Sequence, residues 1–412
     1  MRTLYLSYTG ILEPLAASQI VPHLIALTRR GWPIDAVSWE KPERLARRDL
    51  VESLDGRFRD AGIEWTPLRY HKRPTAPATI FDLAAGLRHL SRHPNLDRWE
   101  QVHVRSYVPA PLALALRRRR SLRFLFDMRG FWADEYVDGE IWPPASPLYR
   151  FAKKGEAAFL RAADDIVVLS HEAKRILEQG HPRLPLVWRS TTPPIHVIPT
   201  CADLERFHPD GELHPAGRPI REDRFVIGYV GSIGTWYEFE AMLDLVASAH
   251  VRDSRVHFLV VTQTPGSEVR RLARSRNLPD VALTVAASEP ADVPSWIRCF
   301  DLGLFFITPA FSKRASCATK MGEILGCGVP LLINRGVGDS EALVDKHRVG
   351  IAAHDLRPWT TSAAYDRVRT IIDGDPELKR RCRRTAEAEF DLARAIEAYV
   401  EIYRSAAAGG AA

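Results

Sequence analysis

Residues suited to binding a phosphate are concentrated in the segment 312–330. Lys313, Arg314 and Lys320 bring three positive charges close together, between an apolar run and an amphipathic stretch. This order predicts a polar loop that passes from a strand into a helix, and Ser316 is placed to cap that helix. The free N–H groups at a helix start, together with nearby cations, form a receptor for a diphosphate. The alternative is an ordinary capped helix with solvated lysines.

Glu323 lies inside the same predicted helix and carries the only carboxylate of the segment 312–330. A carboxylate at this place is suited to accept hydrogen bonds from the diol of a ribose. Together with the cations before it, Glu323 extends the candidate site from a phosphate toward a nucleotide.

A second candidate ligand site is the glycine-rich turn at 228–237, where a strand passes into a helix. Gly231 lets the backbone approach a ligand closely, and Ser232 follows it directly. Trp236 and Tyr237 are placed to stack on a ligand, and core packing is the alternative for either ring. The spacing is not the Gly-x-Gly-x-x-Gly fingerprint, which argues against a nicotinamide cofactor.

Two strand ends in the first half of the chain carry charged side chains. Arg129 follows an apolar strand and is suited to bind an anionic leaving group or a carboxylate, with an ion pair to Asp127 as the alternative. His103 and Arg105 end the preceding strand and share a face by alternation, which favours a place in a site for one of them. The loop after the first strand, residues 8–19, is long for a connection, which favours a function.

Composition limits the class of protein. The chain has 412 residues, of which 46% are hydrophobic and 26% charged, so we expect a globular protein of two or three domains. No apolar run reaches the roughly 20 residues of a membrane helix and the start does not resemble a signal peptide, which predicts a cytoplasmic protein. Five dispersed cysteines without a Cys-x-x-Cys pair argue against disulfides and zinc.

The net charge of +6 suits an anionic ligand. It also leaves peripheral contact with an anionic membrane open, at the inner membrane face. The basic residues are dispersed and no recognition module is present, so nucleic acid is not expected as a partner.

Apolar runs alternate with amphipathic stretches along the chain, which predicts parallel sheets covered by helices on both faces. The strands expected in the first half are 2–8, 34–39, 102–106, 124–128, 165–169 and 196–199. Those expected in the second half are 226–231, 257–262, 282–286, 302–306, 331–334 and 350–353. The pattern indicates two doubly wound α/β domains.

Proline, glycine and polar residues interrupt this pattern at 208–219. We therefore predict a Rossmann-like domain at 1–207, a linker at 208–223 and a second Rossmann-like domain at 224–390. A final helix is expected at 391–408. In such sheets ligands bind beyond the carboxyl ends of the strands, and the cleft between two domains is the default site.

Seven segments in the same order resemble glycosyltransferase family 4, the retaining group 1 enzymes that use nucleotide sugars. They are residues 10–19, 126–132, 198–207, 231–237, 319–323, 336–339 and 390–404. The resemblance implies the GT-B fold, in which two Rossmann-like domains face each other across a cleft and the final helix crosses back to the N-terminal domain. It also implies that no metal or other cofactor is required.

The resemblance further implies that the C-terminal domain binds the donor and the N-terminal domain the acceptor. The catalytic residues expected on this basis are Arg129, His103, Lys320 and Glu323. The donor-binding residues expected are Gly10, Gly231, Ser232, Trp236, Tyr237, Lys313, Arg314, Ser316, Thr319, Lys320 and Glu323. The acceptor-binding residues expected are Glu13, Ser18, Arg105, Trp132 and Asp134.

The chain departs from the family pattern at two places. The usual glutamate pair, eight positions apart, is present only as Glu323, because Ala315 stands at the other position. The arginine and lysine that commonly follow the glycine turn are also absent. We expect other cations to supply charge to the diphosphate, namely Lys313, Arg314, Lys320 and Arg129.

The resulting hypothesis is a retaining glycosyltransferase that works by front-face attack. The donor would be a nucleotide sugar, with UDP favoured over GDP, and the acceptor a hydroxyl of a glycan, a lipid-linked carrier, a protein or a small molecule. Glycan, polysaccharide or glycoconjugate biosynthesis is the expected setting. The alternatives are a non-catalytic binding or scaffold protein with the GT-B fold, and a nucleotide-sugar epimerase of that fold.

Overall fold

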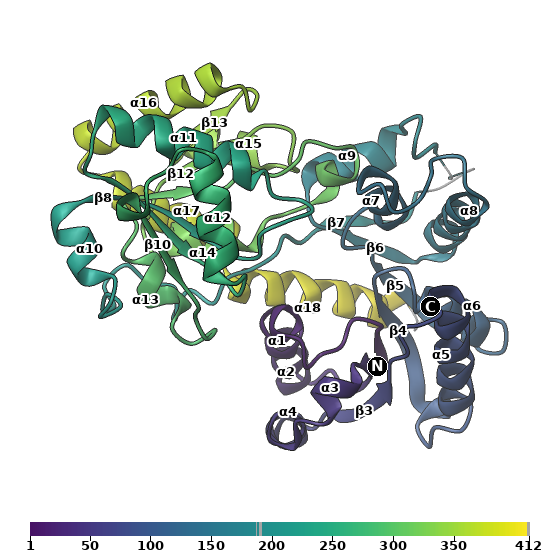
Figure 1. The fold of residues 1–412 in the computed structure, drawn as a ribbon. Helices are drawn as coiled ribbons and strands as arrows, with labels where there is room; N and C mark the ends of the chain where they lie inside the picture. Colours follow the sequence, from purple (N-terminus) through teal and green to yellow (C-terminus); the bar gives the residue numbers. More distant parts are fainter. Residues whose placement is uncertain (187, 189–191, 410–412) are drawn as a thin grey trace. The chain divides into compact units, whose positions relative to one another are not determined.

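The computed structural model describes residues 1–186, 188 and 192–409. The chain divides into two compact units, which are drawn in Figure 1. The N-terminal unit comprises residues 1–198 and the chain from Ala393 onward, and the C-terminal unit comprises Pro199–Leu392. Each unit is built around its own parallel sheet, and we describe each by itself.

A sheet of seven parallel strands forms the centre of the N-terminal unit, in the order β3-β2-β1-β4-β5-β6-β7. The strands are β1 (Arg2–Ser7), β2 (Ile34–Glu40), β3 (Glu64–Arg69), β4 (Trp99–Arg105), β5 (Arg123–Asp127), β6 (Asp165–Val168) and β7 (Ile195–Val197). Six of them were predicted and β3 was missed. It is a half-exposed edge strand that contains Pro67 and pairs only with β2, so it lacks a continuous apolar run.

Helices cover this sheet, and the last helix of the chain belongs to the same unit. They are α1 (Pro14–Gln19), α2 (Val21–Arg29), α3 (Pro42–Leu45), α4 (Arg48–Ala61), α5 (Thr75–Leu90), η1 (Leu96–Arg98), α6 (Ala110–Arg117), α7 (Trp132–Asp138), α8 (Pro147–Ala162), α9 (His171–Gln179) and α18 (Leu392–Gly409). α18 buries Tyr399 and Tyr403 in this unit, both within hydrogen-bond distance of sheet side chains.

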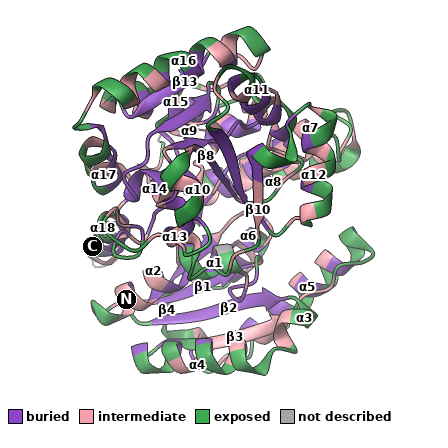
Figure 2. Cartoon of the chain, turned by 60° about the vertical axis from the view of Figure 1, so that its left-hand side comes forward, coloured by how far each residue is buried: buried purple, intermediate pink, exposed green. Residues whose placement is uncertain are grey.

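The C-terminal unit contains a sheet of six parallel strands in the order β10-β9-β8-β11-β12-β13. The strands are β8 (Phe225–Val230), β9 (Val256–Val261), β10 (Leu283–Ala286), β11 (Leu302–Leu304), β12 (Leu331–Asn334) and β13 (Gly350–Ala353). All six coincide with predicted strands. Five of them are almost wholly buried, whereas β10 is buried only at Leu283, and Figure 2 draws β8 and β13 in purple. Burial on both faces is the reason that their sequences read as continuous apolar runs.

The remaining helices lie on the two faces of this second sheet. They are α10 (Arg218–Asp223), α11 (Phe239–Arg252), α12 (Gly266–Ser275), η2 (Asp280–Ala282), α13 (Val293–Ile297), η3 (Ser312–Ala315), α14 (Thr319–Gly326), α15 (Ser340–His347), α16 (Pro358–Gly374) and α17 (Leu378–Glu389). The alternation of strand and helix is that of a doubly wound fold, as the sequence predicted.

Residues 208–223, predicted as the linker, lie inside the C-terminal unit, and the division falls at 198/199 instead. The Arg298 guanidinium donates to the carbonyls of His208 and Glu212, which fastens this segment to the unit. Its proline- and glycine-rich sequence therefore forms a docked surface loop followed by α10. Composition alone does not distinguish such a loop from a linker, because both lie at the surface.

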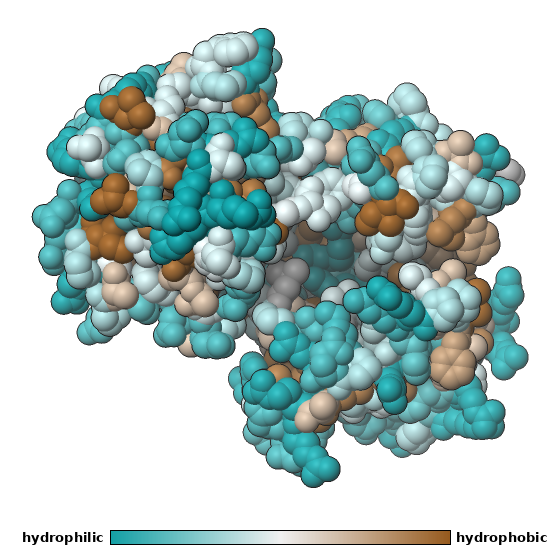
Figure 3. Space-filling model, viewed as in Figure 1, coloured by the Kyte–Doolittle hydropathy of each residue, from teal (hydrophilic) through white to brown (hydrophobic). Residues whose placement is uncertain are grey.

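Among the described residues, no helix is both long enough and apolar enough to cross a membrane. On the face drawn in Figure 3, the surface is mostly hydrophilic, and its apolar side chains form separate small patches.

The order of the strands fixes where a ligand site is expected in each unit. In the C-terminal sheet, β8 pairs with β9 on one side and with β11 on the other. The chain therefore runs outward in both directions from the β8–β11 pair, toward β9 after β8 and toward β12 after β11. In the N-terminal sheet, β1 and β4 have the same relation. Ligands of doubly wound sheets bind at the carboxyl ends of such strands.

Candidate functional site

The candidate site lies in the C-terminal unit, at the carboxyl ends of β8 and β11. The loops after these two strands are joined by main-chain hydrogen bonds, from Glu238 to the Phe306 carbonyl and from Thr308 to the Trp236 carbonyl, both at 3.0 Å. Asn334 at the end of β12 holds the second loop, because its side-chain amide bonds both the N–H and the carbonyl of Ile307 at 2.8 Å. The two loops therefore form one fixed wall at the end of the sheet.

Lys320 is the second residue of α14, and its side chain is directed into this wall. It is only 7% exposed, and its Nζ lies 3.8 Å from the centroid of the Tyr237 ring and 4.3 Å from that of Tyr229. Gly231 leaves room for the ammonium group, since a Cβ added there would lie 2.8 Å from Nζ. Gly231 also has a φ of +131°, which favours glycine for a second reason.

No hydrogen bond is made by Lys320 Nζ to any described residue. Burial of the amine lowers its pKa to about 7, although the nearby Glu323 carboxylate acts in the opposite direction. A buried ammonium group without a hydrogen-bond acceptor is costly, and the three aromatic rings around it offset only part of that cost. Such a group needs an explanation, and an anionic ligand would provide the missing acceptor.

Glu323 lies one turn after Lys320 on α14. Burial raises the pKa of its carboxyl group to about 7, while the charges of Lys320 and Arg206 lower it. This carboxylate forms no ion pair and no hydrogen bond with a described residue. Lys320 and Glu323 are therefore a donor and an acceptor placed side by side, each with bonding capacity unused.

Lys313 forms a second contact between a cation and a ring at the same edge. It belongs to η3 and is 7% exposed, and its Nζ lies 3.7 Å from the centroid of the Trp236 ring. The rings of Trp236 and Tyr237 thus support two lysines, a use that the sequence did not reveal. Arg314 in η3 and Thr319 at the start of α14 are half-buried, whereas Ser232 is exposed after β8.

The predicted cap of the helix by Ser316 is wrong. The N-cap position of α14 is taken by Ala318, and no side chain caps the helix. Ser316 instead ends η3, where its N–H donates to the Lys313 carbonyl at 3.1 Å. The turn of η3 separates Ser316 from the helix start, which the sequence pattern did not show. Ser316 remains half-buried in the loop that precedes α14.

The predicted residues of the N-terminal unit surround a different buried charge, Asp127 at the end of β5. Its carboxylate accepts hydrogen bonds from Tyr399 at 3.2 Å and Arg105 at 3.4 Å, and Arg129 lies at 3.8 Å. The ion pair of Arg129 with Asp127, which was the alternative to a catalytic role, is thus present. Arg129 also has a left-handed φ of 61°, an unusual conformation for a residue other than glycine.

His103 has a structural place in this unit. It is 3% exposed, and its Nδ1 lies 2.9 Å from the hydroxyl of Tyr403 on α18. Burial lowers the pKa of this imidazole to about 4, so the ring is neutral near pH 7. Its Nδ1 attaches α18 to the sheet, whereas its buried Nε2 has no hydrogen-bond partner among the described residues, so the expected catalytic role stays a prediction.

Asp134 does not fit the acceptor-binding role expected for it. It is fully buried and accepts hydrogen bonds from Tyr149 at 2.8 Å, Lys153 at 2.9 Å and Arg183 at 3.0 Å. These partners saturate its carboxylate and join α7 to α8. Trp132, at the start of α7, is half-buried among aromatic rings, and its predicted contact with an acceptor stays a prediction.

The loop after β1 is organised by Glu40, a buried carboxylate that sequence reasoning missed. Glu40 ends β2 and accepts hydrogen bonds from the N–H groups of Ile11 at 2.7 Å and Leu12 at 3.1 Å. Gly10 is required for this packing, since a Cβ there would lie 2.5 Å from Glu40 Oε2. A glutamate that ends an apolar strand was the available signal. The conformation of Gly10 thus has a structural reason, and its predicted contact with the donor is untested.

Glu13 and Ser18, the other predicted residues of this loop, are not brought together. Glu13 forms ion pairs with Lys41 and Arg44, each at 3.3 Å, and Ser18 is exposed on α1. The loop is shorter than predicted because α1 already begins at Pro14. The ion pairs of Glu13 give it a structural partner on the segment after β2.

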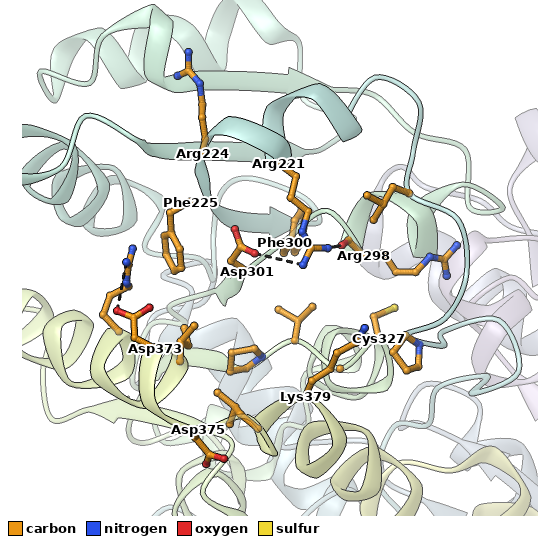
Figure 4. A pocket seen from close by; sticks show the side chains of 18 of the residues that line it. Arg221, Arg224, Phe225, Arg298, Phe300, Asp301, Cys327, Asp373, Asp375 and Lys379 are labelled. Carbon is orange, nitrogen blue, oxygen red and sulfur yellow. Dashed lines mark hydrogen bonds and ion pairs between the residues drawn. The ribbon is translucent and has the colours of Figure 1, made fainter.

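A large pocket of about 650 Å³ lies at the opposite edge of the C-terminal sheet (Figure 4). Its wall includes residues that precede strands, such as Arg224 before β8 and Asp301 before β11. Asp301 forms an ion pair with Arg221 at 3.4 Å, and Arg369 lies 3.5 Å from Asp373. Because its arginines have protein partners and it lies at the amino ends of the strands, this pocket is a poorer candidate than the Lys320 site.

The fold and the site define the class of protein. Two doubly wound parallel sheets, with a cationic site after β8 and β11 of the second, agree with the GT-B fold implied by the resemblance. Residues 22–188 match the model of the glycosyl transferase 4-like domain. These residues are therefore similar to a glycosyltransferase domain, in agreement with the predicted resemblance. A comparison with curated protein sequences finds no match.

Solved structures of GT-B proteins are similar along the whole chain. Sucrose-phosphate synthase from Thermosynechococcus elongatus has a TM-score of 0.70 at 14% identity, with 99% of this chain and 100% of that chain covered. HepE of Anabaena in complex with UDP and glucose has a TM-score of 0.67 at 12% identity, with 98% and 100% covered. A trehalose-6-phosphate protein from E. coli bound with UDP-2-fluoro glucose has a TM-score of 0.69 at 12% identity, with 97% and 98% covered. At these identities the likeness shows the fold.

Proposed function

We propose that this protein is a retaining glycosyltransferase that moves a sugar from a nucleotide sugar, with a UDP-sugar favoured, to a hydroxyl acceptor. The observation that carries the proposal is the buried Lys320 Nζ, which has no hydrogen-bond acceptor at the end of the β8–β11 pair. The match of residues 22–188 to a glycosyltransferase domain supports the same activity. The complexes of similar structures with UDP and UDP-2-fluoro glucose favour uridine nucleotides as ligands.

In this proposal the diphosphate of the donor binds against the start of α14. Lys320 Nζ would donate to a phosphate oxygen, and the uncapped N–H groups of the helix would bind the same anion. Lys313 and Arg314 would add charge from η3. Glu323, one turn further along the helix, would accept hydrogen bonds from hydroxyl groups of the donor.

The same arrangement suits the reaction. When the bond between the sugar and the phosphate breaks, negative charge develops on the leaving phosphate oxygen. Lys320 and the helix N–H groups are fixed in place and would stabilise that charge more strongly in the transition state than in the ground state. Glu323 is the only carboxylate among the predicted donor-binding residues, so the pair of carboxylates used by glycosidases is not proposed here. The departing phosphate would take the proton of the attacking hydroxyl, on the same face of the sugar.

Turnover of UDP-glucose is the first test of this proposal. Release of UDP, with and without added hydroxyl compounds, distinguishes a transferase from its alternatives. Binding of UDP without any turnover would favour the non-catalytic GT-B-like protein, and conversion of the donor sugar without UDP release would favour an epimerase. Absence of UDP binding would refute the donor site itself.

The stereochemistry and the metal requirement are tested separately. The anomeric configuration of the product, read by NMR, should equal that of the donor, and inversion would refute front-face attack. We also propose that no metal is required, so turnover should persist in EDTA. Loss of turnover in EDTA and its recovery with Mg²⁺ or Mn²⁺ would contradict this. The setting in glycan or glycoconjugate biosynthesis and peripheral contact with an anionic membrane stay predictions.

A further inference from the structure

A histidine–aspartate pair lies at the carboxyl edge of the N-terminal sheet, outside all of the predicted site residues. His71 follows β3 and its Nδ1 lies 2.5 Å from an oxygen of Asp82, which is on α5 and 1% exposed. Asp82 also accepts hydrogen bonds from the main-chain N–H of His71 at 3.0 Å and from the hydroxyl of Tyr8 at 2.9 Å. Tyr8 follows β1, so the cluster joins the ends of two strands through one buried carboxylate.

The bond to Asp82 fixes the orientation and the tautomer of the imidazole. Because a carboxylate only accepts hydrogen bonds, Nδ1 of His71 carries the proton and the neutral ring has its lone pair on Nε2. The His71 side chain is 39% exposed, and Nε2 has no partner among the described residues. A buried aspartate thus holds a histidine in place and directs an available acceptor atom outward.

Aromatic side chains surround this atom. The Phe81 ring is 59% exposed and its centroid lies 5.2 Å from that of His71, and Ile80 beside it is 68% exposed. Tyr70 lies between His71 and the end of β3, and its ring is 5.5 Å from that of Tyr8. The surface around Nε2 therefore combines one fixed polar atom with apolar ring faces.

A second group of aromatic rings lies within electrostatic range of the first. Burial raises the pKa of Tyr136 on α7, and Tyr70 contributes to that rise. Tyr136 stacks on Trp142 at 4.4 Å and contacts Trp132 at 5.2 Å. Aromatic side chains from α7 and from the segment after β3 are thus close to one another at this edge.

We propose that His71, held by Asp82, binds a hydroxyl group of the acceptor, and that the acceptor presents a hexopyranose ring to this edge. The inference rests on the proposed function, because an acceptor exists only if the protein is a transferase. A pyranose has hydroxyl groups that donate to Nε2 and apolar C–H faces that pack on aromatic rings, so its chemistry matches the surface. His71 has the role of an acceptor-binding residue, and the departing phosphate keeps its role as the proton acceptor.

A purely structural role for the pair, as a tie between the segment after β3 and α5, is the competing explanation. His71→Asn separates the two, because the amide nitrogen of asparagine can replace Nδ1 toward Asp82 while Nε2 is lost. The substitution should leave the melting temperature close to that of the wild type and weaken glycoside binding about tenfold, the scale of one hydrogen bond. His354→Asn is the matched control, since His354 is 76% exposed beside Asp355 in the C-terminal unit.

The test uses full-length protein with histidines labelled at ¹³Cε1, saturated with UDP. Octyl β-D-glucoside, octyl β-D-galactoside and octyl α-D-mannoside are titrated in turn to millimolar concentration, and the His71 signal is assigned from its absence in His71→Asn. At least one glycoside should shift this signal saturably in the wild type. Calorimetry with that glycoside, which does not need the His71 signal, should show binding weakened in His71→Asn and unchanged in His354→Asn. If no glycoside shifts it, or if binding is equal in both variants, the proposal is overturned.

UDP binding to the same samples distinguishes this failure from a failure of the proposed function. If UDP binds and UDP-glucose is turned over while none of the three glycosides shifts the His71 signal, only the acceptor site is refuted. Absence of UDP binding in the wild type would instead refute the proposed function, and with it the reason for an acceptor.

Discussion

The two units contain the same kind of feature, a buried charge at the carboxyl ends of central strands. They differ in whether the protein provides a partner of opposite charge. Asp127 in the N-terminal unit forms ion pairs with Arg105 and Arg129, and its Oδ2 accepts hydrogen bonds from Arg105 and Tyr399, while Oδ1 has only the Arg129 guanidinium at 3.8 Å. Lys320 in the C-terminal unit is also buried, but it has aromatic rings around it and neither an ion pair nor a hydrogen-bond acceptor among the described residues. A charge whose partners are supplied by the protein stabilises the fold, whereas a charge that lacks them indicates a ligand.

The largest effect on stability is expected at Asp127. Asp127→Ala removes the shared partner of two guanidinium groups that are 13% and 15% exposed, so we expect a loss of about 3–5 kcal/mol in the free energy of unfolding. Urea denaturation measures this change. Asp49→Ala is the control, because Asp49 pairs with Arg47 at the surface. This variant should unfold at the wild-type urea midpoint. Equal midpoints for the two variants would show that the Asp127 network is not structural.

Lys320→Met should separate activity from stability. Loss of the ammonium group is expected to remove about 2–4 kcal/mol of transition-state stabilisation, and kcat/KM for UDP-glucose should fall accordingly. The melting temperature of the free protein should rise, because a buried cation without an acceptor is replaced by an apolar side chain. Lys379→Met, in the pocket at the opposite edge of the sheet, is the matched control and should change neither quantity. If Lys320→Met is less stable than the wild type but fully active, Lys320 stabilises the fold and does not bind the donor.

Tyr403→Phe tests whether His103 attaches α18 to the sheet. The substitution leaves the buried Nδ1 of His103 without its partner at 2.9 Å, so we expect about 1–3 kcal/mol of destabilisation. Turnover of UDP-glucose per folded molecule should be unchanged. If Tyr403→Phe loses turnover but keeps wild-type stability, the result would support the predicted catalytic role of His103.

The smallest expected effect is a pH dependence of UDP binding. Burial lowers the pKa of Lys320 to about 7, so the free protein loses the ammonium charge above that pH, and the bound diphosphate must restore it. The affinity for UDP should therefore fall as the pH rises above 7, by up to about tenfold per unit, with proton uptake on binding. Burial raises the pKa of Glu323 to about 7 as well, so its ionisation acts in the same direction.

Calorimetry in buffers of different ionisation enthalpy measures this proton uptake. The pH dependence of UDP affinity has one contribution from each residue. Glu323→Gln should remove the first contribution and Lys320→Met the second. A UDP affinity that stays constant between pH 7 and pH 9 would place the diphosphate away from Lys320.

The same two residues give the free protein a pH-dependent stability with opposite signs. The pKa of Lys320 is lower in the folded than in the unfolded chain, so its penalty is relieved as the pH rises from about 7 toward 10.5. The pKa of Glu323 is higher in the folded chain, so stability is lost as the pH rises from 4.5 toward 7. The contribution of this pair to stability is therefore lowest near pH 7, where an anionic ligand has the most to gain.

Most of the fold was predictable from the chain because buried parallel strands have a local signature. Continuous apolar runs located all six strands of the C-terminal sheet and six of seven in the other. The strand that was missed, β3, lies at an edge with one neighbour, so its alternating and proline-containing sequence carries no such run. The predicted linker failed for a related reason, since docking of 208–223 depends on Arg298, which is distant in sequence.

The candidate site was predictable in part. The cations of η3 and α14 were found from their types and spacing, but Ser316 was wrongly placed as a cap because the turn of η3 was not visible. Asp134 was chosen for its chemistry, and its burial against α8 with several hydrogen-bond donors gives it a structural place, whereas the role of His103 beneath α18 stays a prediction. His71 and Asp82 went unnoticed, because eleven residues and a change of element separate them in the sequence.

The sequence by itself determined that this protein has two doubly wound sheets and that cations follow a strand of the second. Those properties follow from local patterns, in which apolar runs specify buried strands and residue type specifies charge. Only the tertiary structure decided which charges have partners. Whether a lysine contacts a carboxylate or the face of a tyrosine depends on elements that folding brings together. Lys320 is a candidate ligand-binding residue because Tyr229, Tyr237 and Gly231, which belong to β8 and the loop after it, bury its amine without providing an acceptor.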